Sequence, residues 1–90
     1  MNALKNYVAE KNRWRAIFKQ APLSLDNATD RQRIAETIDC DLSPENLTCD
    51  GELRGAELQA RHRKLITAAR QLNELDPGAA RVIYELYTGE

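Results

Sequence analysis

Two long stretches of the chain have apolar residues at steps of three and four, the spacing that places side chains on one face of an α-helix. In residues 2–21 this face holds Leu4, Tyr7, Val8, Trp14, Ile17, Phe18 and Ala21. In residues 55–75 it holds Leu58, His62, Leu65, Ile66, Ala69, Leu72 and Leu75. We therefore expect two long amphipathic helices, the first of which ends before Pro22, because proline does not continue a helix.

A shorter helix is predicted between them, over about residues 30–39. Thr29 and Gln32 have the spacing of a capping box, in which the hydroxyl accepts from the later amide and the longer side chain reaches back to the earlier one. After residue 39 the helical period is lost. Residues 40–54 are therefore expected to form an irregular acidic loop, with a single helical turn at 44–47.

A fourth helix is predicted over about residues 77–87, with Asp76 as its cap and Pro77 in the first-turn position that suits proline. Composition agrees with a helical chain, because there are twelve Ala and eleven Leu but only two Val. Ninety residues leave room for one core. We expect a single all-α domain over residues 1–90, a small bundle in which the two long helices pack antiparallel and the shorter two close its sides.

The thirteen basic and fourteen acidic residues almost cancel, but they are distributed unevenly along the chain. Residues 1–21 carry five bases and one acid, and residues 54–73 carry the same. Residues 22–53 carry two bases and eight acids, and residues 74–90 one base and four acids. The long helices are thus basic and the connections acidic, which makes an interaction surface unless the acidic loop folds beside the basic helices.

The basic residues of the two long helices form the first candidate binding site. The residues that would share one face of an antiparallel pair are Arg13, Arg15, Arg61, Arg63 and Lys64. A row of cations of this kind suits the phosphates of a nucleic acid. The nearly neutral net charge argues against that use, because nucleic-acid modules usually carry a basic excess. The alternative is a solvated helix face with Trp14 in the core.

The C-terminal helix is the second candidate, because its apolar residues, Tyr84 and Tyr87 among them, occupy more than one side. One side must pack on the bundle, and the other is either covered by residues 23–53 or exposed. Interfaces favour tyrosine, and so short a chain gains stability by association. We expect this helix to take part in docking a partner or in a homodimer.

Metal and catalytic chemistry have little support in the sequence. Cys40, Cys49 and His62 are three of the four ligands that a structural zinc site needs, and the cysteines are not a tight pair. The acidic loop lacks the glycine and the glutamate that a calcium loop needs at fixed positions. No phosphate-binding glycine loop or nucleophile motif is present. We expect no enzymatic activity, no metal and no cofactor.

Cellular location is inferred from what the chain lacks. No apolar run approaches the roughly 18 residues that cross a bilayer, and the N-terminal residues lack the apolar region of a signal peptide. We expect a cytoplasmic protein that does not bind membranes, with reduced cysteines. The sequence predicts a small helical accessory or regulatory protein, in the style of phage or prophage genes, that binds another protein; nucleic-acid binding is the alternative.

Overall fold

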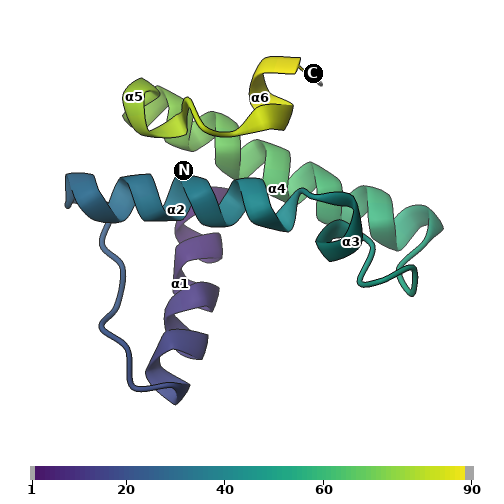
Figure 1. Ribbon diagram of the computed structural model, residues 1–90, viewed down its shortest axis with the longest axis horizontal. Helices are drawn as coiled ribbons and strands as arrows, with labels where there is room; N and C mark the ends of the chain where they lie inside the picture. The colour runs from purple at the N-terminus through teal and green to yellow at the C-terminus, as the bar shows by residue number, and fades with distance from the viewer. Residues whose placement is uncertain (1, 89–90) are drawn as a thin grey trace.

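Six helices follow one another along the chain, and no strand is found among residues 2–88, the part that the computed structural model describes (Figure 1). Side chains are described as far as residue 86. The helices are α1 (Asn2–Ile17), α2 (Ala28–Asp41), α3 (Pro44–Leu47), α4 (Gly55–Leu75), α5 (Pro77–Ala80) and α6 (Tyr84–Thr88). The all-α class expected from the sequence is confirmed.

The longest helix, α4, is the element on which all the others pack. α2 lies beside it and runs in the opposite direction (Figure 1). The N-terminal half of α1 also packs on α4, but the rest of α1 extends away from the body of the molecule (Figure 1). The antiparallel pairing of the two longest helices is therefore not confirmed.

The core joins α1, α2, α4 and the segment that follows α5. Its largest fully buried side chains are Leu4, Ile34, Ile38, Leu72 and Ile83. Burying each of them stabilises the fold by about 1.5–3 kcal/mol relative to leaving it exposed. The core takes only two residues of α1, Leu4 and Val8, both from its N-terminal half.

Helix α1 ends at Ile17, four residues before the predicted end. Lys19 adopts a left-handed backbone conformation with a φ of 58°. Its amide donates to the carbonyl of Ala16 at 3.0 Å, and the amide of Gln20 donates to the carbonyl of Arg15 at 2.7 Å. These two bonds form a Schellman motif, which ends a helix by satisfying its last carbonyls.

Helix α2 begins at Ala28, so the predicted capping box at Thr29 is wrong. The cap is Asn27, whose side-chain oxygen accepts from the amide of Asp30 at 2.9 Å. Asn27 thus provides the side-chain acceptor for an amide of the first turn, two residues before the position that we expected for the cap.

The predicted helix over residues 77–87 is divided into α5 and α6. Asp76 caps α5 as expected, accepting from the amide of Ala79 at 3.1 Å. The chain then turns so that Ile83 enters the core. The amide of Tyr84, at the start of α6, donates instead to Asp39 of α2 at 2.6 Å. Burial of Ile83 and this contact with α2 thus replace the continuation of the helix.

Asp76 also links two parts of the fold through an ion pair, because its carboxylate lies 2.7 Å from the Nε of Arg31 on α2. The hydrogen bond from Arg31 lowers the pKa of Asp76 below its ordinary value of 3.8, and the amide of Ala79 adds to the effect. The ionised form of Asp76 is therefore favoured by folding.

Replacing Lys19 by glycine should stabilise the protein by about 1 kcal/mol, because glycine adopts the left-handed conformation without a steric cost from Cβ. Lys19→Ala is the matched control, since it removes the same charge but keeps the Cβ. Urea denaturation measures both. Equal stability of the two variants would contradict a left-handed cap at this position.

Asp76→Asn should make the protein less stable at neutral pH and less sensitive to acid. A carboxyl whose pKa is lower in the folded state contributes stability above its unfolded pKa and loses it as the pH falls through the folded value. The wild type should therefore lose more unfolding free energy than the variant between about pH 5 and about pH 2. Parallel curves from denaturation at several pH values would show that Asp76 is not the linked group.

Candidate interaction surface

Three large apolar side chains stand in solvent at the C-terminal end of α1. Trp14, Ile17 and Phe18 are 56%, 66% and 69% exposed, and we call them the apolar tip. This end of the helix extends away from α2 and α4, and the chain returns from it to the start of α2 (Figure 1). The expectation of Trp14 in the core is wrong.

The returning chain is fixed to α1 on another side of the helix. The side-chain oxygen of Asn12 accepts from the amide of Leu23 at 2.7 Å, and its NH₂ group donates to the carbonyl of Leu23 at 3.0 Å. Leu23 itself is buried. Arg15 adds a bond from its Nε to the carbonyl of Ala21 at 2.6 Å. These contacts hold the end of α1 in place and leave the apolar tip uncovered.

Basic residues surround the apolar tip. Residues 11–21 contain four bases and no acid. Lys11 is paired with Asp41 at 2.9 Å, which leaves Arg13, Arg15 and Lys19 around the tip. Arg13 and Lys19 are exposed. Because Arg13 and Arg15 precede and follow Trp14 on the helix, they flank its side chain on opposite sides.

The basic residues of α4 do not all face solvent. The guanidinium of Arg61 donates to the backbone carbonyl of Asn46 in the α3 turn at 3.3 Å, and its Nε is buried without a partner. Arg63 and Lys64 are exposed. Of the three α4 cations in the expected ridge, one is thus turned towards the protein.

A cleft of about 770 Å³ separates the N-terminal half of α1 from α4, and acids line it together with bases. Glu10 and Glu57 lie in its wall beside Lys64. Asp41, in the same cleft, accepts a hydrogen bond from the hydroxyl of Tyr7 at 2.8 Å. Burial, followed by this bond, raises the pKa of Tyr7 well above its usual range. The row of cations expected across α1 and α4 is interrupted by these carboxylates.

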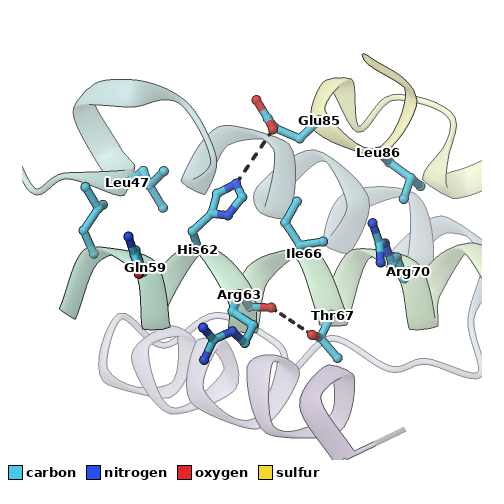
Figure 2. Close-up of a pocket in the computed structure, with 10 residues that line it drawn as sticks. Leu47, Gln59, His62, Arg63, Ile66, Thr67, Arg70, Glu85 and Leu86 are labelled. Carbon is cyan, nitrogen blue, oxygen red and sulfur yellow. Dashed lines mark hydrogen bonds and ion pairs between the residues drawn. The ribbon is translucent and has the colours of Figure 1, made fainter. Parts of the chain in front are cut away.

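A groove of about 630 Å³ lies on another side of α4, between α3 and α6 (Figure 2). Leu47 and Leu86 lie on its two sides, and Ile66 lies on α4 between them. His62 reaches from α4 towards Glu85 of α6, with 3.8 Å between nitrogen and oxygen. The side chain of His62 is part-exposed, so it does not take the core position that its place in the apolar row suggests.

The tyrosines of the C-terminal candidate lie on α6. Tyr84 is 68% exposed, and its backbone amide holds α6 to Asp39. The side chain of Tyr87 is outside the described part of the structure. The exposed Tyr84 is accessible to a partner or to a second copy of the chain. The contact that we expect there stays a prediction.

The two cysteines are free and exposed. Cys40, at the end of α2, accepts a weak hydrogen bond from the side chain of Asn46 at 3.4 Å. Over the described residues 2–88, no group of three or more His, Cys, Asp or Glu side chains is arranged to hold a metal ion. No helix in the same range is long and apolar enough to span a membrane.

Comparison of the chain with models of protein families, with curated proteins and with solved structures finds no match.

The apolar tip was not among the binding residues expected from the sequence, although Arg13 and Arg15 beside it were. Trp14, Ile17 and Phe18 have among themselves the spacing of one apolar side of a helix, so this spacing alone suggests burial. One signal was present in the sequence, because the bases that surround these residues have no acid among them.

Asn12→Ala should destabilise the protein by about 1–3 kcal/mol, since it removes both partners of a buried backbone unit at Leu23. Asn6→Ala, at an exposed position of the same helix, is the control and should change stability by less than about 0.5 kcal/mol. Urea denaturation and amide hydrogen exchange at Leu23 report the two effects. Unchanged exchange at Leu23 would show that Asn12 does not fix the returning chain.

Proposed function

We propose that this protein is a small interaction module that binds a partner protein through the apolar tip of α1. The observation that carries the proposal is the exposure of Trp14, Ile17 and Phe18 together, on a helix end that extends from the body (Figure 1). Tryptophan and arginine are the residues most enriched among those that dominate binding energy at interfaces. The tip combines a tryptophan with two arginines beside it.

Magnitudes indicate how such a tip would bind. Burying the exposed part of these three side chains, which is 56–69% of each, supplies roughly 3–6 kcal/mol. Association costs about 4–15 kcal/mol in lost freedom, so the tip alone gives weak binding at best. The surrounding cations add to affinity by attracting opposite charges on the partner. The hydrogen bonds that fix the returning chain add to affinity because they reduce the conformational entropy lost on binding.

Nucleic-acid binding, the alternative expected from the basic residues, has less support. Trp14 and Phe18 offer rings on which bases stack, but Ile17 between them does not. Arg61 is turned towards Asn46, and carboxylates interrupt the remaining cations. The surface around Tyr84 on α6 remains a second place where a partner or another copy could dock, because that side chain is 68% exposed.

The double substitution Trp14→Ala with Phe18→Ala should leave folding stability nearly unchanged, within about 0.5 kcal/mol per site, because both side chains are exposed. Leu72→Ala, which opens a cavity in the core, should cost about 2–5 kcal/mol. Urea denaturation compares them. A loss of several kcal/mol in the tip variant would mean that these side chains are structural, against the proposal.

Photo-crosslinking tests the function directly. A benzophenone amino acid at position 17 should crosslink to a protein in the native cell, and the same group at position 36, exposed on α2, should not. The adduct should disappear when Trp14 and Phe18 are changed to alanine. No protein adduct at position 17, or the same adducts from both positions, would refute the proposal.

A further inference from the structure

Building on the proposed function, we infer that the partner is a different protein that offers an apolar groove with carboxylates along its rim, into which the end of α1 inserts. Three features favour this partner: the shape of the apolar tip, the charges around it, and the charges that line the groove and the cleft of the protein itself.

The shape of the apolar tip favours a concave binding site on the partner. Trp14 and Ile17 stand at positions i and i+3 of α1, and Phe18 follows at i+4, directly after the last residue of the helix. This is the spacing by which an amphipathic helix anchors in a hydrophobic groove. The surface is convex, because the helix end extends from the body (Figure 1). A convex surface of this kind is complementary to a concave one.

The rim of that groove must be acidic. Arg13, Arg15 and Lys19 surround the tip, and no carboxylate occurs from residue 11 to residue 21. Opposite charges at the rim attract the correct partner, while like charges placed against each other cost several kcal/mol. The charges of α1 thus select a groove lined by aspartate or glutamate.

A second copy of this chain does not provide such a groove. Two tips placed face to face would bring only like charges together. The groove between α3 and α6 carries one carboxylate, Glu85, beside the bases His62, Arg63 and Arg70. The cleft between α1 and α4 carries equal numbers of acids and bases: Glu10, Asp41, Glu57, Lys11, Arg61 and Lys64. Neither hollow attracts the basic tip.

A lipid surface fits the structure less well than a groove. A helix that binds at a bilayer interface lies in its plane with a long apolar face against the lipid. In the N-terminal half of α1 the apolar residues Leu4 and Val8 are already buried in the core. Only the short tip is left to insert.

The end of α1 is also fixed by hydrogen bonds in the free protein. The bonds of Asn12 to Leu23 and of Arg15 to Ala21, with the Schellman motif at Lys19, fix the helix end and the returning chain. A preorganised anchor loses little conformational entropy when it binds. A rigid helix end of this kind suits a preformed groove, because it can bind there without rearranging.

Charge reversal tests the inference with the crosslinker at position 17. Arg13→Glu with Lys19→Glu should reduce the protein adduct at least about tenfold, because the rim would then repel the partner. The matched control, Arg63→Glu with Lys64→Glu, reverses two exposed bases on α4 and should leave the yield within about twofold. Mass spectrometry of the adduct should identify a peptide of another protein with Asp or Glu near apolar residues.

Each other outcome overturns the inference. A crosslink that persists in Arg13→Glu/Lys19→Glu excludes an acidic rim while the proposed docking at the tip stands, whereas loss of every adduct from the wild type refutes both. An adduct with a peptide of this chain identifies a second copy as the occupant. Trp14, the only tryptophan, gives a further check. A blue shift of its emission with phosphatidylserine vesicles would assign the tip to lipid. Quenching of its emission by a single-stranded oligonucleotide of about 20 nucleotides, whose bases stack on the ring, would assign the tip to nucleic acid.

Discussion

The structure depends on the burial of one face of α4. Ala68, Ala69 and Leu72 of this face are almost completely shielded from solvent. The two alanines are small, so neighbouring helices can approach closely, and Leu72 fills the space between them. α2, α5 and the first half of α1 all pack on α4. The large apolar side chains at the end of α1 have no place on this face and remain exposed.

The exposed end of α1 is nevertheless well ordered by polar contacts. Asn12 binds both backbone groups of Leu23, and Lys19 ends the helix in a conformation that glycine usually adopts. These contacts position the returning chain without using any residue of the apolar tip. The same arrangement therefore determines both the direction in which the chain reaches α2 and the side of α1 that faces solvent.

The uneven charge of the chain is partly neutralised within the fold. Asp41 pairs with Lys11, Asp39 accepts the first amide of α6, and Asp76 pairs with Arg31. These acids join helices that are distant in the sequence. Within the part of the chain that the structure describes, the cations at the end of α1 form no ion pair of this kind between helices, and Arg13 and Lys19 are exposed beside the apolar tip.

The sequence by itself determined the features that depend on neighbouring residues. The range of α4 follows from its period, and the starts of α3 and α5 follow from their prolines. The sequence also places Arg13 and Arg15 in a candidate binding site, and their role in binding stays a prediction. Only the tertiary structure decided that the predicted C-terminal helix breaks at Ile83 and that Trp14 is exposed. Periodicity identifies the apolar side of a helix, but whether that side is covered depends on how much surface the rest of the chain has left to pack against it.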